Sequence, residues 1–280
     1  MTREEYIENH KDKFLDELFD LLRIPSISAD QAYVGDVQKC EEYVAKRLQE
    51  AGADNVTLEK TAGNPIVYGE KMVDPSKPTI LVYGHYDVQP SFPDELWNTP
   101  TFKHTIKNGN IYARGACDDK GQMYMHLKAF ETMMETNTLS CNVKFMIEGE
   151  EEVGSTNLGI YVQANQEKLK ADVVLISDTG MIANDIPSID TGLRGLSYVE
   201  VEVTGPKIDL HSGSFGGAVG NPINVLCDMI SSLHDENRHV TIPGFYDSVD
   251  VVSDSDRAEM AKTSFSLDEY KAELDVNDVM

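Results

Sequence analysis

Short apolar runs alternate with amphipathic segments through the first part of the chain, and this alternation restricts the fold more than any other feature of the sequence. The runs Thr79–Tyr83, Asn142–Ile147 and Val173–Ile176 have the length and apolar content of buried strands. Helix-like patterns lie between them, at Lys120–Glu135 and Leu158–Leu169. Strands that alternate with helices indicate an α/β domain with a largely parallel sheet.

The N-terminal region predicts two helices ahead of that sheet. Thr2 and Glu5 form a capping-box pattern before a helix that should end near Ile24, because Pro25 disfavours helical geometry in the residue before it. A second helix is expected over Val37–Ala51. Further strands are expected at Val56–Glu59, Ile66–Tyr68 and Ile111–Ala113.

The pattern changes near residue 190 and predicts a second, smaller α/β domain. The segment Leu196–Thr204 alternates apolar residues with acidic ones, which is typical of a strand with one exposed face. Asn221 as N-cap and Pro222 at the first helical position begin a helix that should reach Leu233. We therefore assign residues 1–193 to a first domain and residues 194–280 to a second.

Charge and cysteine usage narrow the partners and the compartment. A formal net charge of −24 repels phosphate backbones, which argues against a nucleic-acid partner. The four cysteines are dispersed without a C-x-x-C pair, as is typical of a reducing compartment. The N-terminus carries charges where a signal peptide needs an apolar run, and no apolar stretch approaches the roughly 20 residues that cross a bilayer. The sequence predicts a cytoplasmic protein without a membrane segment.

Acidic residues and a histidine follow four of the predicted strands. A lone histidine or an acidic turn is more often structural than functional, so no single position carries an argument. The carboxyl ends of the strands of an open α/β sheet meet at one edge, however, and we expect these side chains to gather there. They are His85, Asp87, Asp118, Asp119, Glu150, Glu151, Glu152 and Asp178.

Such a gathering of carboxylates predicts bound cations. Asp87, Asp118, Glu151, Glu152 and Asp178 sum to −5, and two divalent ions would supply +4. Carboxylate and imidazole ligands suit zinc, manganese or cobalt, and the lack of thiolate ligands argues against a closed structural zinc site. Cys117, next to Asp118, is interpreted as a packing residue.

Five sequence blocks resemble the M20 metallopeptidase family, in its carnosinase-like dipeptidase branch. They are GHYDVQP (84–90), RGACDDKG (114–121), IEGEEEVGS (147–155), LISDT (175–179) and DLHSGSFGG (209–217), in the family's order. The resemblance implies a catalytic domain of the zinc-exopeptidase type with a mostly parallel sheet, and a smaller α/β lid or dimerisation domain. It also implies a homodimer that hydrolyses dipeptides or short peptides with two divalent metal ions, zinc first among them.

The resemblance assigns the metal ligands residue by residue. His85 and Asp178 would bind one ion, Glu152 would bind the other, and Asp118 would bridge both, with a cis peptide bond to Asp119. Asp87 would stand behind His85 and orient its imidazole, which is a usual device at metal centres.

The same resemblance assigns the catalytic groups. Glu151 would be the general base for a metal-bridging water, and His211 would stabilise the oxyanion in the partner subunit's active site. Glu150 receives no role, although a slip of one position would exchange the base and the ligand.

Two other functions stay open. An N-acyl amino-acid deacylase of the acetylornithine or succinyl-diaminopimelate type uses the same metals, and only the GHYDVQP and DLHSGSFGG blocks favour the dipeptidase. An inactive dimerising scaffold is the third hypothesis, although every expected ligand within the chain is chemically competent.

The resemblance finally implies that these 280 residues lack the family's returning catalytic segment. That segment would carry one more metal ligand and the basic residues that clamp the substrate carboxylate. We expect weak or single-metal binding, association through exposed apolar sheet edge, and negligible turnover from this chain alone.

Overall fold

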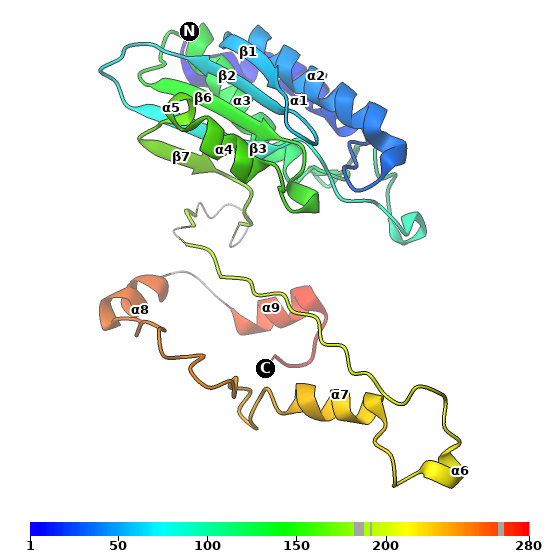
Figure 1. Cartoon of the computed structure of the whole chain (residues 1–280). Coiled ribbons are helices and arrows are strands. Elements are labelled where there is room, and N and C mark those ends of the chain that lie inside the picture. Colours follow the sequence, from blue (N-terminus) through cyan, green and yellow to red (C-terminus); the bar gives the residue numbers. More distant parts are fainter. Residues whose placement is uncertain (182–187, 191, 263–265, 280) are drawn as a thin grey trace. The chain divides into compact units, whose positions relative to one another are not determined.

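The computed structural model describes residues 1–181, 188–190, 192–262 and 266–279, which form two compact units (Figure 1). The first unit is Met1–Gly192 and the second is Leu193–Met280. The roles of catalytic domain and lid, expected for residues 1–193 and 194–280, stay predictions. No described helix combines the length and the hydropathy that a membrane crossing requires.

A five-stranded sheet forms the centre of the first unit. In spatial order its strands are β1 (Asp54–Glu59), β2 (Ile66–Lys71), β6 (Asn142–Glu148), β3 (Thr79–His85) and β7 (Val173–Ile176). The strands β6, β3 and β7 run parallel to one another, whereas β1 and β2 pair antiparallel.

The α/β class is confirmed, but the sheet is mixed rather than largely parallel. Only residues 60–65 connect β1 to β2. A parallel pairing needs a crossover of about a dozen residues or more, so this short connection can only make a hairpin.

Helices cover the two faces of the sheet unequally (Figure 1). On one face lie three long helices: α1 (Arg3–Leu22), α2 (Val34–Glu50) and α3 (Lys120–Glu135). They pack on strand residues such as Val67 and Val82 in the main hydrophobic core. The other face, which carries Tyr68 and Leu81, has only the short helices α4 (Leu158–Ala164) and α5 (Gln166–Leu169). The single helix expected over Leu158–Leu169 is therefore divided, at Asn165.

Local sequence signals fix several helix ends as expected. The capping box of α1 is confirmed, since Thr2 N donates to Glu5 Oε2 at 2.8 Å and Glu5 N donates to Thr2 Oγ1 at 3.2 Å. The helix ends at Leu22, slightly before the predicted end. The remaining elements of the first unit are short: the 3-10 turns Gln31–Tyr33, Asp94–Leu96 and Glu151–Val153, and the hairpin of β4 (Thr105–Lys107) and β5 (Asn110–Tyr112).

The second unit forms, among its described residues, short helices joined by long irregular segments. Its helices are α6 (Ser212–Phe215), α7 (Pro222–Ser231), α8 (Asp254–Met260) and α9 (Leu267–Leu274). Asn221 caps α7 as predicted, because its Oδ1 accepts a hydrogen bond from Ile223 N at 2.9 Å.

The strand expected over Leu196–Thr204 is wrong. These residues are described but form no ladder, and Tyr198 is 90% exposed. An alternating pattern makes a strand only where a neighbour supplies backbone hydrogen bonds, and the described part of this unit offers none to the segment.

The strand β7 forms an edge of the sheet. Among the described strands it pairs with β3 alone, and its four apolar residues, Val173 to Ile176, are between 38% and 56% exposed. An exposed strand edge of this kind presents unpaired backbone N–H and C=O groups to which a further strand can bind.

A buried network of charges holds α1 against α3. Lys128 on α3 donates to both Glu17 on α1 and Glu131 on its own helix. Tyr124 adds a hydrogen bond of 2.8 Å to Glu17, and Lys13 lies 2.7 Å from Glu131. Burial alone would raise the pKa of both glutamates, but the bonds from Lys128 hold each pKa below its ordinary value.

Replacing Lys128 should therefore destabilise the first unit. We expect Lys128→Met to lower the free energy of unfolding by about 2 kcal/mol, because it removes two buried hydrogen bonds to carboxylates, while Arg47 still pairs with Glu17 and Lys13 with Glu131. Urea unfolding followed by circular dichroism measures the loss. The charged glutamates stabilise the fold fully at pH values above their ordinary pKa. This stabilisation is lost as the pH falls through the lowered pKa of the folded state, so the two proteins should differ less in free energy of unfolding in acid.

The control removes an exposed lysine. Lys39 is 69% exposed and pairs with Asp36 on the surface of α2, so Lys39→Met should change stability by about 0.5 kcal/mol or less. Equal losses of stability in the two variants would show that the buried network stabilises the fold no more than a surface ion pair does.

Candidate metal centre

The parallel strands β6, β3 and β7 end at one edge of the sheet (Figure 1). Asp118 and Asp119 come instead from the segment between the separate β4–β5 hairpin and α3. His85 is the last residue of β3, where it pairs with Glu148 at the end of β6. On the other side, β7 ends at Ile176, opposite Tyr83. The carboxyl ends of β6, β3 and β7 therefore lie together, with β3 in the middle.

His85 is the centre of a compact cluster. Its side chain is fully buried, and its Nε2 lies 3.2 Å from Asp118 Oδ1 and 3.6 Å from Asp178 Oδ2. One ligand atom from each of the three residues lies within 4.8 Å of the others, a spacing that could hold a metal ion. The peptide bond between Asp118 and Asp119 is cis, as the resemblance implies.

Asp87 connects the imidazole to the next loop. His85 Nδ1 lies 3.0 Å from the carbonyl oxygen of Asp87 and 3.3 Å from its Oδ1. The other carboxylate oxygen, Oδ2, accepts hydrogen bonds from Ser28 Oγ at 2.6 Å and from Glu152 N at 3.2 Å. Asp87 is thus placed to orient the ring, and it also fixes the backbone of a second predicted ligand.

Several pKa values in the cluster are raised, which shows that its negative charge is incompletely balanced. Burial raises the pKa of Asp178, of Glu151 and of Glu152. It raises the pKa of Asp119 to about 7, against a hydrogen bond from His85 N. For His85 burial acts downward, but the bond to Asp87 and the nearby carboxylates prevail and raise the pKa to about 10.

A divalent cation fits this donor set. The cluster offers an imidazole and two carboxylates, which are the ligands that zinc, manganese and cobalt accept. One buried oxygen, Asp119 Oδ1, has no hydrogen-bond partner among the described residues. A cation would replace the proton that the crowded charges draw onto His85.

The three consecutive glutamates differ in their surroundings. Glu150 accepts hydrogen bonds from Asn157 Nδ2 at 2.8 Å and from Asn64 N at 3.3 Å, so its carboxylate links two loops. The Glu151 carboxylate accepts no hydrogen bond from any described residue. Glu152 is held by Gln89, whose Nε2 and backbone N donate to its two oxygens at 2.8 Å and 3.1 Å.

The other predicted site residue, His211, belongs to the second unit. It caps the short helix α6, where its Nδ1 accepts a hydrogen bond from Gly213 N at 3.0 Å. Its catalytic role stays a prediction, as do the separate roles of Glu151 and Glu152.

Sequence reasoning missed two contacts of the centre. Ser28 gave no signal, because it reaches Asp87 only through the long-range pairing of Ile27 with Val88. Gln89 belonged to a recognised block, but no pattern in the sequence placed it against Glu152.

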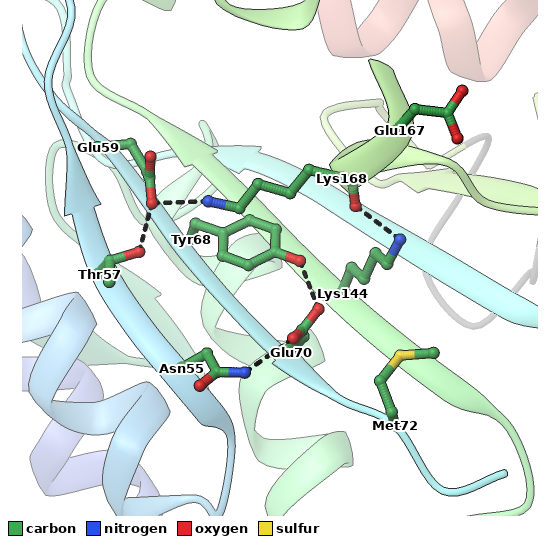
Figure 2. A pocket seen from close by; sticks show the side chains of 9 residues that line it. All are labelled: Asn55, Thr57, Glu59, Tyr68, Glu70, Met72, Lys144, Glu167 and Lys168. Carbon is green, nitrogen blue, oxygen red and sulfur yellow. Dashed lines mark hydrogen bonds and ion pairs between the residues drawn. The ribbon is translucent and has the colours of Figure 1, made fainter. Parts of the chain in front are cut away.

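A hollow of about 420 Å³ lies away from these residues, between the strands β1, β2 and β6 and the helix α5 (Figure 2). Its polar groups satisfy one another. Lys168 binds Glu59 at 2.7 Å over the ring of Tyr68, whose hydroxyl donates to Glu70 at 2.6 Å. Lys144 donates to the carbonyl oxygen of Lys168 at 2.6 Å. With these partners in place, the hollow is no candidate for the chemistry of the cluster.

Comparison with known proteins agrees with the geometry. A Cys-Gly metallodipeptidase of Schizosaccharomyces pombe is 37% identical over 258 residues, which are 88% of this chain and 54% of that protein. The human Beta-Ala-His dipeptidase is 31% identical over 282 residues, 95% of this chain and 56% of that protein. The crystal structure of an M20 family metallo-carboxypeptidase from Sulfolobus solfataricus matches with a TM-score of 0.79 and 36% identity, over 95% of this chain and 60% of that one.

The chain thus spans little more than half the length of the curated relatives that it matches. The sequence profile of Peptidase family M20/M25/M40 matches residues 81–276, which contain every predicted ligand and catalytic residue. The relatives also bear out the carnosinase-like branch that the five blocks indicate. The chain therefore belongs to peptidase family M20/M25/M40.

Proposed function

We propose that the whole protein hydrolyses dipeptides or short peptides with the help of divalent metal ions. The observation that supports this most directly is the cluster of His85, Asp118 and Asp178 at the carboxyl edge of the sheet. Relatives of the same family carry the names Cys-Gly metallodipeptidase and Beta-Ala-His dipeptidase. Because the chain covers only part of their length, the activity is proposed for the whole protein.

Two metal ions would be held by this set of residues. His85, Asp118 and Asp178 would hold one ion, while Asp118 and Glu152 would contribute to the other. Zinc is our first candidate, with manganese and cobalt as alternatives. When bound, the metals supply Lewis acidity, which makes water easier to deprotonate and polarises the scissile carbonyl.

The protein's own groups would move the proton and stabilise the charge. Glu151 would take a proton from the attacking water and pass it to the leaving amine. Its raised pKa supports this role, because a carboxylate with a low pKa is a weak base and accepts protons poorly near neutral pH. His211, from the partner subunit of a homodimer, would stabilise the oxyanion.

The compartment and the competing activities complete the proposal. The proposed location is cytoplasmic, because four dispersed cysteines without a C-x-x-C pair are typical of a reducing compartment. An N-acyl amino-acid deacylase would cleave N-acetyl amino acids faster than dipeptides, and a parallel assay of both substrate classes separates the two. An inactive scaffold would bind no metal and cleave neither.

Removing the bridging ligand should empty the centre. We expect Asp118→Ala to lose both ions, since one carboxylate serves the two, and a chelator should abolish hydrolysis until Zn²⁺, Mn²⁺ or Co²⁺ is restored. Mass spectrometry of the dialysed protein counts the metal. Asp36→Ala, which removes a carboxylate on α2, is the control and should keep the full content. Two tightly bound ions in Asp118→Ala would disprove the bridging assignment.

The adjacent glutamates should fail in different ways. Glu151→Gln should keep its metal and lose about 10²–10⁴ in kcat, the usual contribution of a general base. Glu152→Gln should lose metal affinity first. Glu150→Gln is the matched control, because Glu150 is engaged with Asn64 and Asn157, and it should retain both metal and turnover. A reversed pattern for Glu151 and Glu152 would show that the roles are shifted by one position.

Mixed dimers test the assignment of His211. Subunits with His211→Ala and subunits with Glu151→Gln should each be inactive alone. If His211 acts across the dimer, exchange of subunits creates sites in which both groups are intact, and dipeptide hydrolysis should reappear. Continued inactivity, after exchange has been demonstrated with labelled subunits, would place His211 elsewhere.

A further inference from the structure

The predicted ligand Asp178 follows β7, a short strand at the edge of the sheet. The strand β7 has four residues and pairs, in the part of the chain that the structure describes, with β3 alone, and its last pair is Ile176 with Tyr83. Asp178 lies two residues beyond that pair, so the ladder does not fix its carboxylate. The position of Asp178 Oδ2, 3.6 Å from His85 Nε2, therefore depends on contacts outside the strand ladder.

A hydrogen bond from the neighbouring residue supplies that support. Ser177 Oγ lies 2.6 Å from Nε2 of His126, on the helix α3. Among the described residues, this is the hydrogen bond that ties Ser177 or Asp178 to another element. Both partners are half-buried, and burial lowers the pKa of His126, so its imidazole stays neutral at pH 7. A neutral imidazole and a hydroxyl can bond in either tautomer.

The helix α3 therefore reaches both carboxylates of the cluster. It begins at Lys120, directly after Asp118 and Asp119, so its start fixes the first carboxylate. His126 follows Asp119 by seven residues, which is about two turns and returns to the same face of the helix. One rigid element thus sets Asp118 directly and Asp178 through the bond to Ser177.

We propose that His126 is a positioning residue of the metal centre, which acts through Ser177 to hold Asp178 against His85. His126 is not itself a ligand, since the group that could hold an ion consists of His85, Asp118 and Asp178. The inference rests on the proposed metal centre and adds to it an orienting contact on a ligand's neighbour. Such contacts contribute to affinity by keeping a ligand in the geometry that the ion needs.

Zinc titration of the whole protein tests the role, because it needs no substrate. Ser177→Ala and His126→Phe should each weaken zinc binding about tenfold or more, the usual effect of losing an orienting contact. The double variant should bind no more weakly than either single one, because all three lack the same bond. Ser177→Thr keeps the hydroxyl and should bind zinc like the unaltered chain.

Two controls separate positioning from general damage. His10→Phe alters a histidine of α1 that bonds only within its own helix, and it should leave zinc affinity unchanged. The thermal unfolding midpoint of each metal-free variant shows whether the fold is intact. We expect the midpoint of Ser177→Ala to lie close to that of the unaltered protein.

The outcomes are distinct. Zinc affinity within twofold of the unaltered chain in both Ser177→Ala and His126→Phe would overturn the inference and leave the metal centre standing. Additive losses in the double variant would also overturn it, since the two residues would then act independently. An unaltered whole protein that binds no zinc would overturn the metal centre, and the inference with it.

Discussion

Mutual repulsion among carboxylates around one buried histidine is the constraint on which the rest of this structure depends. Asp87, Asp118 and Asp178 all lie close to His85, in a place where burial weakens the solvation of charge. Without a cation, the balance is met by protons, on His85 and on acids such as Asp119. A site built this way is poorly satisfied alone and would be well satisfied by divalent ions, so a bound ion would stabilise the fold.

The scaffold bears this repulsion because the cluster is anchored from several sides. The central strand β3 carries His85 between two parallel neighbours. The chain after α1 runs beside the exit of β3, where Val88 N donates to Ser26 O at 3.0 Å. The fully buried Lys120 fastens that chain to the start of α3, since its Nζ donates to the carbonyl oxygens of Ile24 at 2.7 Å and of Leu21 at 3.2 Å. The segments that carry His85 and Asp118 are thereby tied to one another as well as to the sheet.

Much of this could be predicted from the sequence, because the signals are local. The capping box at Thr2 and the apolar period of β3 each report on a few adjacent residues. The positions of His85 and Asp178 followed from a general rule about strand ends, whereas Asp118, which follows the separate β4–β5 hairpin, was indicated by a recognisable block. What the sequence did not provide were contacts between distant segments, such as Ser28 with Asp87 and His126 with Ser177. The strand expected at 196–204 was wrong for the same reason, since its pattern says nothing about whether a partner lies beside it.

The position of β7 has a consequence for the dynamics of the centre. A short edge strand with exposed side chains opens at low cost, so its amide hydrogens exchange with solvent before those of β3 or β6. Asp178 lies two residues beyond this strand, and any opening of β7 would withdraw a predicted ligand from the cluster. By linkage, an ion that needs Asp178 must in turn slow the opening of β7, and hydrogen exchange in Val173–Ile176 becomes a local gauge of metal occupancy.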